Sequence, residues 1–294
     1  MKQIVFTFNK KCNWNCDYCN QKLLDKSIEK SDEDLIIDFK KWLTFSLKYN
    51  DYISLYLCGG EPGLWSEKFW EEITKIIDSF ISKIMFLGVF TNGTTFVNNF
   101  FNKDSYNRIQ HLWHCTTSIK DTIVKLPFLD GRRFLLGTNV IPMIVLQKSE
   151  IQYLEKFIID NPQLGQFYID LAQNSKYTKG VEDFTVEDYE EVIKIIRKFP
   201  HRISTETLMS INATKNRLKA EGISSIQKIC SKQNHMVLID LAEDNIYRCC
   251  NYSSSVKLTE ENLKLKFSNK LFLNEECGNC VNKVAYYGVV QYNA

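Results

Sequence analysis

The chain has 294 residues, of which 44% are hydrophobic, enough to bury the core of one large domain or of one domain with a smaller appendage. Its 37 Lys and Arg residues nearly balance its 35 Asp and Glu residues, and this near-neutral charge disfavours nucleic acid or an anionic membrane as a partner. No apolar run approaches the roughly 20 residues that cross a bilayer, and the N-terminus lacks the pattern of a signal peptide, so we expect a cytoplasmic protein.

Short apolar runs typical of strands alternate along the chain with longer segments of helical periodicity. Strands are expected at residues 4–8, 52–57, 84–90, 111–118, 133–145 and 166–171. Helices are expected at residues 32–47, 66–80, 149–159 and 185–199, with Ser31 and Thr185 as the N-caps of the first and the last. Six strands that alternate with helices predict an α/β architecture with a parallel sheet.

The character of the sequence changes towards its end. Five of the ten cysteines fall between Cys230 and Cys280, among short strand-like pieces. These pieces predict a β-hairpin whose turn lies at residues 242–245. We therefore expect one domain over residues 1–222 and a second, smaller domain over residues 223–294.

Cys12, Cys16 and Cys19 follow the first expected strand with C-x3-C-x2-C spacing. In a reducing compartment, ten cysteines favour metal binding or catalysis over disulfides. Thiolates are soft ligands that suit iron–sulfur clusters or zinc, but structural zinc usually needs four ligands, and no histidine lies near this set in the sequence. Three thiolates on a four-iron cluster would leave one iron open to a substrate or cofactor.

This loop, with Tyr18 directly before its last cysteine, resembles the signature of the radical S-adenosylmethionine (SAM) superfamily. Gly59, Gly60, Glu61 and Pro62 end the second expected strand and resemble the motif with which that superfamily binds the amino group of SAM. Glycines allow the backbone to approach a ligand closely, and a carboxylate accepts hydrogen bonds from an ammonium group.

Three positions after or at the end of the third and fourth expected strands also resemble family positions near the cofactor: Thr91, Asn92 and Ser118. Ordinary turn chemistry is the alternative explanation for them. The resemblance implies a partial (β/α)6 TIM-like barrel that holds SAM and a [4Fe–4S] cluster. It also implies reductive cleavage of SAM to a 5′-deoxyadenosyl radical, with an electron donor such as flavodoxin or ferredoxin, and removal of a hydrogen atom from a small-molecule or peptide substrate.

The later cysteines resemble those of the SPASM/twitch subgroup, in which a hairpin ends in a ligand of an auxiliary [4Fe–4S] cluster. The resemblance implies a small twitch-like domain with four cluster ligands: Cys230, Cys249, Cys277 and Cys280. Cys250 is the alternative to Cys249, because successive side chains of a strand face opposite ways. The subgroup usually has Gly in the hairpin turn, where this chain has Asp244 and Asn245, and we expect Asn to tolerate the left-handed backbone. A zinc ribbon-like site is the alternative to the cluster.

Tyr168 and Asp170 share a face of the sixth expected strand, and either could bind substrate or remove a proton, because catalytic groups of β/α barrels lie at the carboxyl ends of strands. Asp170 could equally cap a turn. The chain begins eleven residues before Cys12, so we expect no fused leader-peptide domain. This expectation favours a small molecule, or a peptide presented by a separate protein, as the substrate.

The expected reaction is an oxidation, either a dehydrogenation or a bond formation, in which the auxiliary cluster accepts an electron from the substrate radical. Within the same class, the alternative is an epimerase, an isomerase or a ribosomal-peptide maturase in which Cys250 or Cys115 returns a hydrogen atom. The alternative from another class is a zinc-stabilised binding module without catalysis.

Overall fold

The computed structural model describes residues 2–16, 19, 30–93, 111–116, 119, 139–172, 182–221, 236–247, 255–269 and 271. Its first six strands are β1 (Lys2–Thr7), β2 (Ile53–Cys58), β3 (Ile84–Thr91), β4 (His111–Thr116), β5 (Asn139–Leu146) and β6 (Tyr168–Leu171). Each of these strands pairs in parallel with the next, which confirms the predicted α/β class and parallel sheet.

Three short strands extend this sheet beyond β1: β7 (Met236–Asp240), β8 (Asn245–Tyr247) and β9 (Ser255–Lys257). β7 runs parallel to β1, whereas β8 and β9 pair antiparallel, so the order is β6-β5-β4-β3-β2-β1-β7-β8-β9. The predicted hairpin is present, and it continues the barrel sheet. The left-handed residue of its turn is Asp244, with φ of 54°, and not Asn245. Asp adopts this region because its short polar side chain can form local hydrogen bonds.

Six α-helices are described: α1 (Asp32–Lys48), α2 (Glu67–Ser79), α5 (Ile151–Asp160), α6 (Val186–Arg197), α7 (Thr205–Glu221) and α9 (Glu260–Phe267). The 3-10 helices are η1 (Pro62–Leu64), η2 (Ile81–Lys83), η5 (Lys148–Glu150) and η6 (Pro162–Leu164). Ser31 and Thr185 cap α1 and α6 as predicted, because their hydroxyls accept hydrogen bonds from backbone amides of the first turn. α7, α9 and β9 were not predicted. None of the described helices has both the length and the apolar character that crossing a membrane requires.

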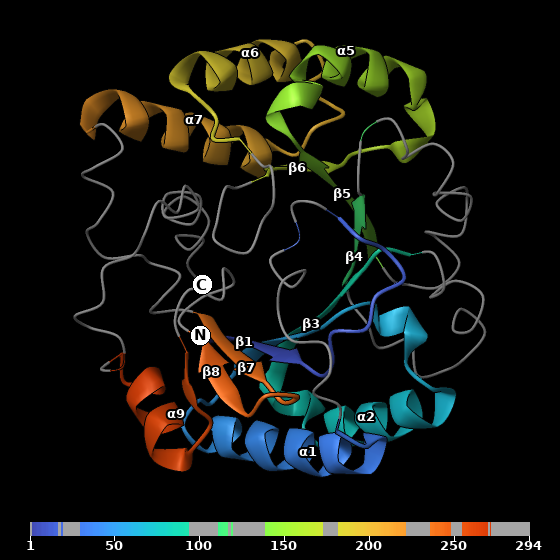
Figure 1. The fold of residues 1–294 in the computed structure, drawn as a ribbon, viewed down its shortest axis with the longest axis vertical. Helices are drawn as coiled ribbons and strands as arrows, with labels where there is room; N and C mark the ends of the chain where they lie inside the picture. The colour runs from blue at the N-terminus through green and yellow to red at the C-terminus, as the bar shows by residue number, and fades with distance from the viewer. Residues whose placement is uncertain are drawn as a thin grey trace.

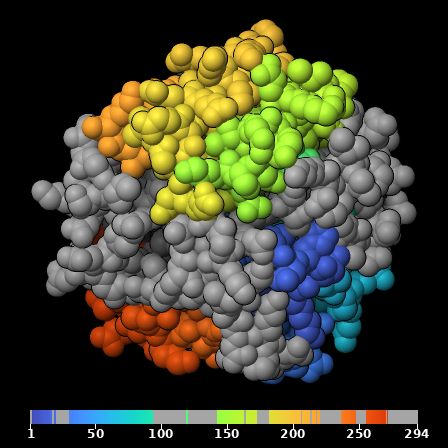
Figure 2. All heavy atoms as spheres, turned by 45° about the horizontal axis from the view of Figure 1, so that its top comes forward, coloured from blue at the N-terminus to red at the C-terminus, as the bar shows by residue number. Residues whose placement is uncertain are grey.

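The helices lie on the outer side of the curved sheet (Figure 1). α1 and α2 pack together below β1 to β3, while α5, α6 and α7 pack together beyond β6. On the surface, α5 to α7 (green to orange) form one end of the molecule, and α9 (red) lies at the opposite end (Figure 2). This arrangement is the partial TIM-like barrel that the sequence predicted.

Aromatic rings fill the layer between β1 and the helices below it. The ring centroid of Phe8 lies 5.2 Å from that of Phe39 in α1, 4.8 Å from that of Trp65 and 5.4 Å from that of Phe69 in α2. All four side chains are buried, and burying a Phe side chain contributes roughly 1.5–3 kcal/mol. The segment that leads from β1 to Cys12 is therefore anchored in the core.

Candidate functional site

The cysteine loop begins beyond the carboxyl end of β1. The side chains of Cys12, Cys16 and Cys19 are half-buried, and none of the three forms a disulfide with another described cysteine. The amide of Trp14 donates to Cys12 Sγ at 3.4 Å, and the amide of Cys19 donates to the carbonyl oxygen of Cys16 at 3.1 Å. An N–H directed at sulfur favours the thiolate, the form that binds metals. Tyr18 lies outside the described residues.

The turn after β2 packs directly on the segment that joins β1 to the cysteine loop. Gly59 and Gly60 have φ of 114° and 52°, which residues with a Cβ rarely adopt. A Cβ on Gly60 would lie 1.8 Å from the carbonyl oxygen of Lys11, and one on Gly59 would lie 2.5 Å from that of Asn9. The amide of Glu61 donates to the same Lys11 oxygen at 2.7 Å. The two glycines therefore bring the turn against the chain's own backbone next to Cys12.

Glu61 is fully buried between the ends of β2 and β3. Its carboxylate accepts hydrogen bonds from the amides of Gly63 at 2.8 Å and Asn92 at 2.6 Å, and from the hydroxyl of Thr91. Burial raises the pKa of Glu61 above its ordinary value, although these three donors act to lower it. Pro62 follows as the first residue of η1, for which Glu61 is the N-cap. Because a carboxylate has about four acceptor positions, one more donor can be accommodated.

Asn92 joins the cysteine loop to Glu61. Its side-chain amide donates to Asn13 Oδ1 at 2.8 Å and to Cys12 Sγ at 3.8 Å, while its backbone amide binds Glu61. The residue before it, Thr91, reaches the same carboxylate. The structure thus brings together motif residues that follow three different strands of the sheet.

The residues at this edge fit the two groups that the sequence implied. Cysteine thiolates are soft ligands for an iron–sulfur cluster, and a buried carboxylate with a spare acceptor position suits an ammonium group. Within the described part of the chain, no three His, Cys, Asp or Glu side chains converge on a position for a single metal ion.

Comparison with known proteins gives matches at the level of structure. No protein-family model and no curated protein matches the sequence. The chain is similar to anSMEcpe with bound AdoMet, with a TM-score of 0.62 and 13% identity over 91% of this chain and 78% of that one. It is also similar to Streptococcus suis SuiB bound to S-adenosylmethionine, with a TM-score of 0.60 and 13% identity over 96% and 71% of the two chains. SuiB bound to the precursor peptide SuiA gives a TM-score of 0.59 and 13% identity over 96% and 70%.

These neighbours are radical SAM enzymes. The chain has the radical SAM fold. In this fold, the four hydrogen bonds that link Cys12, Asn13, Glu61, Thr91 and Asn92 lie at the carboxyl ends of β1, β2 and β3, the edge at which β/α barrels carry their catalytic groups.

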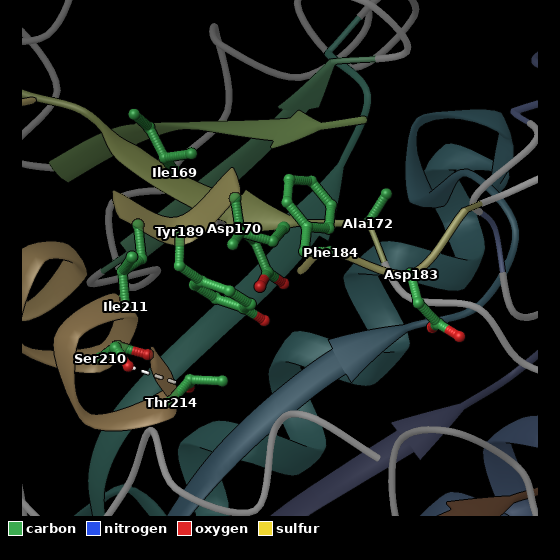
Figure 3. A pocket seen from close by; sticks show the side chains of 10 residues that line it. Ile169, Asp170, Ala172, Asp183, Phe184, Tyr189, Ser210, Ile211 and Thr214 are labelled. Carbon is green, nitrogen blue, oxygen red and sulfur yellow. Dashed lines mark hydrogen bonds between the residues drawn. The ribbon is translucent and has the colours of Figure 1, made fainter. Parts of the chain in front are cut away.

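The predicted substrate residues of this radical SAM fold lie on its edge strand, β6. Tyr168 and Asp170 alternate with Ile169 and Leu171, which are buried in the core under the helices. Tyr168 and Asp170 therefore share the face of β6 that points away from this core, and the prediction that they lie on one face is confirmed. Asp170 also lines a pocket at the end of β6 (Figure 3), and Tyr168 is not among the described residues that line it.

A buried group of charges beside the cysteine loop was not predicted. The side chain of Lys10 is 3% exposed, and its ammonium group contacts Glu243 and lies 3.5 Å from Asp240 Oδ2. Glu243 also accepts a hydrogen bond from the Tyr247 hydroxyl at 2.7 Å. Burial raises the pKa of Asp240, against the lowering effect of Lys10. A polar Asp240 at the end of an apolar run was the only sequence signal for this group.

The remaining predicted site residues lie outside the described residues. They are Ser118, Cys230, Cys249, Cys250, Cys277 and Cys280. The auxiliary site therefore stays a prediction.

Proposed function

We propose that the chain is a radical SAM enzyme that cleaves SAM reductively and removes a hydrogen atom from a small-molecule or peptide substrate. The observation that carries this proposal is the position of Asn92, whose side chain contacts Cys12 and whose backbone binds Glu61. The three motifs that meet there each resemble a part of one cofactor site. Ordinary turn chemistry gives no reason for their convergence.

In this proposal, the thiolates of Cys12, Cys16 and Cys19 hold the [4Fe–4S] cluster. When bound, the cluster supplies the electron that cleaves SAM to a 5′-deoxyadenosyl radical, and this chemistry belongs to the cofactors rather than to the protein. The contribution of the chain is to bind, to orient and to exclude water.

Glu61 binds the ammonium group of SAM through the acceptor position that its three intramolecular donors leave open. Because Gly63, Thr91 and Asn92 already fix this carboxylate, little side-chain freedom is lost on binding. The other proposed SAM contacts rest on the sequence resemblance: Tyr18, Gly59, Gly60, Pro62 and Ser118.

We further propose an auxiliary [4Fe–4S] cluster in residues 223–294, which would accept an electron from the substrate radical and so complete an oxidation. Its ligands would be Cys230, Cys249 (or Cys250), Cys277 and Cys280. The position of β8 supports this assignment, because the strand ends at Tyr247, two residues before Cys249, and its hairpin is hydrogen-bonded to β1 through β7.

A peptide substrate gains support from SuiB, a protein of this fold that has been solved with its precursor peptide SuiA. Tyr168 and Asp170 are the residues proposed to bind the substrate or to remove a proton from it. An electron donor such as flavodoxin or ferredoxin completes the set of partners.

Anaerobic reconstitution with iron and sulfide tests the proposal. We expect brown protein with roughly eight irons per chain when both clusters form. Reduction with dithionite in the presence of SAM should then give 5′-deoxyadenosine. Colourless protein that holds stoichiometric zinc and leaves SAM intact would contradict the proposal and favour a zinc-stabilised binding module.

A further inference from the structure

Two lysines flank the cysteine loop in the sequence, Lys10 before Cys12 and Lys30 after Cys19. Both lysines form ion pairs with carboxylates at the turn between β7 and β8 (residues 241–244). One turn, far from the loop in the sequence, thus contacts the chain at both ends of the segment that carries the three cysteines.

At the first end of this segment the contact is buried. The ammonium group of Lys10 pairs with Glu243 and lies 3.5 Å from Oδ2 of Asp240. The side chains of Lys10 and Asp240 are almost completely buried, so salt screens little of their attraction. The carbonyl oxygen of the next residue, Lys11, accepts the amide of Glu61 at 2.7 Å. The buried ion pairs therefore hold the chain directly beside the contact between the cysteine loop and the turn that carries Glu61.

At the second end the contact is partly exposed. The ammonium group of Lys30 donates to Oδ1 of Asp244 at 2.5 Å and to Oδ2 of Asp38 at 2.7 Å. Asp38 belongs to α1, whose N-cap follows Lys30 directly, so this pair ties Lys30 only to its own helix. The pair with Asp244 instead ties Lys30 to the hairpin.

The turn that holds both lysines is itself fixed by hydrogen bonds. Oδ1 of Asp240 accepts two backbone amides of the turn, at 3.0 Å and 3.1 Å. The carboxylate of Glu243 also accepts the hydroxyl of Tyr247 in β8 at 2.7 Å. The amide of Leu258, directly after β9, donates to the carbonyl oxygen of Asp244 at 2.7 Å. A turn that is already ordered in this way loses little freedom when it holds the lysines.

We propose that the hairpin turn clasps the cysteine loop at both ends, and that Glu243 and Asp244 are thereby positioning residues for the cluster and for SAM. The inference rests on the proposed function and adds residues of the C-terminal hairpin to the same site. A loop whose ends are held at a fixed separation has fewer conformations than a free one. The three thiolates then lose less freedom when they bind the cluster, and the carboxylate proposed to bind SAM keeps its place beside them. Glu243 and Asp244 act through Lys10 and Lys30.

Two substitutions at the turn test the inference on the reconstituted holoenzyme. Asp244→Asn removes the charge but keeps a residue that tolerates the left-handed backbone. Glu243→Gln removes the charge of the buried partner of Lys10 with little change of shape. The dissociation constant for SAM, measured by equilibrium dialysis without reductant, should rise about threefold in Asp244→Asn. It should rise about tenfold in Glu243→Gln, because loss of a buried partner costs more than loss of an exposed one.

The electron paramagnetic resonance signal of the dithionite-reduced cluster gives a readout that a loss of stability alone would not change. SAM bound at the open iron alters this signal. At a fixed, subsaturating concentration of SAM, the altered fraction of the signal should therefore fall in both variants. Iron analysis of the same samples normalises the signal to the amount of cluster.

Asp38→Asn is the matched control, because it removes the same charge from the same ammonium group but leaves Lys30 paired with the turn. The affinity for SAM and the altered fraction of the signal should both remain at the wild-type level. A loss of affinity in Asp38→Asn as large as that in Asp244→Asn would overturn the inference, since the effect would then not depend on the turn.

Wild-type affinity and a wild-type signal in both turn variants would overturn the inference as well. If circular dichroism shows that Glu243→Gln does not fold, Asp244→Asn, at its more exposed position, decides the question alone. A wild-type chain that binds and cleaves SAM, with turn variants that do the same, contradicts this inference only. A wild-type chain whose signal does not respond to SAM and that forms no 5′-deoxyadenosine contradicts the proposed function instead.

Discussion

Glu61 is buried, yet three hydrogen bonds fix its carboxylate at the point where β2 and β3 end. An ionised group in such a place is costly unless its acceptor positions are filled. The Gly63, Thr91 and Asn92 donors fill most of them, and the remaining position has the chemistry to receive an ammonium group. At the residue scale, the carboxylate that the fold buries and fixes is thus the same carboxylate that is proposed to bind SAM.

The substitution Glu61→Gln tests this role with almost no change of shape. The neutral amide loses the charge-assisted hydrogen bond to SAM, so the dissociation constant for SAM should rise at least about tenfold. The iron content should be unchanged, because Glu61 is not a cluster ligand. Equilibrium dialysis with SAM measures the effect, and Glu155→Gln, at an exposed ion pair with Lys198, is the control. Unchanged affinity in Glu61→Gln would remove this carboxylate from the proposed site.

The raised pKa of Glu61 gives a pH dependence with a definite sign. Its folded-state pKa lies above the ordinary value of 4.5, so the folded chain holds this proton more tightly than the unfolded chain. Its contribution to stability is complete below pH 4.5 and is lost as the pH rises through the raised pKa. Binding of SAM needs the ionised carboxylate of Glu61, so the affinity for SAM should rise over the pH range in which this contribution to stability is lost. SAM affinity measured from about pH 5 to pH 8 should therefore increase with pH in the wild type and change less in Glu61→Gln.

At the element scale, the hairpin of β7 and β8 is attached to the cysteine loop by charge as well as by strand pairing. β7 lies beside β1 in the sheet, and Lys10, in the segment between β1 and Cys12, contacts Asp240 and Glu243 of the hairpin. A buried cation with two carboxylates is stable only as a set, because removal of one partner leaves buried charge without compensation. The C-terminal hairpin therefore helps to hold the start of the cysteine loop.

Lys10→Met should lower the free energy of unfolding by about 3 kcal/mol, since Asp240 and Glu243 would remain with no counter-charge. The double variant Lys10→Met/Asp240→Asn should recover part of this loss. Urea unfolding of the anaerobic protein measures both, and Lys75→Met, which breaks an exposed ion pair with Glu72, should have no measurable effect. Equal stability of Lys10→Met and wild type would contradict a structural role for this group.

The same element shows what could and could not be predicted from the sequence. The hairpin itself follows from two apolar runs around a polar turn, and its presence was predicted. The pairing of β7 with β1 was not predicted, because no local sequence pattern specifies which distant strand will pair with a given strand. The contact between Lys10 and Asp240 follows from that pairing alone. Asp244, rather than Asn245, takes the left-handed position. α7 was missed because its apolar residues form only a weak helical stripe.

At the scale of the whole molecule, the cofactor edge was predictable because each motif directly follows its own strand. Carboxyl ends of parallel strands lie on one edge, so Cys12, Glu61 and Asn92 had to be neighbours once the strand order was known. The pocket at the carboxyl end of β6 was not predictable, because Tyr189 and Thr214 line it from α6 and α7, whose positions depend on helix packing. Strand periodicity alone predicted the face of β6 that Asp170 occupies.

The proposed auxiliary cluster predicts a division of iron between the two parts of the chain. The double variant Cys277→Ser/Cys280→Ser should lower the iron content from about eight to about four per chain. It should still form 5′-deoxyadenosine from SAM, because the first cluster is intact, but it should no longer complete an oxidation. Iron analysis together with product analysis checks this outcome. Unchanged iron in the double variant would show that these cysteines are not ligands.

The most direct test of the central claim is the formation of 5′-deoxyadenosine by a variant that lacks all three early thiols, Cys12→Ala/Cys16→Ala/Cys19→Ala. The matched control is Cys58→Ser, which alters a half-buried thiol outside the motif at the end of β2. With dithionite and SAM, we expect the control to form 5′-deoxyadenosine at the wild-type level and the triple variant to form none. Reductive cleavage of SAM by the triple variant would contradict the proposed role of the cysteine loop and, with it, the proposed function.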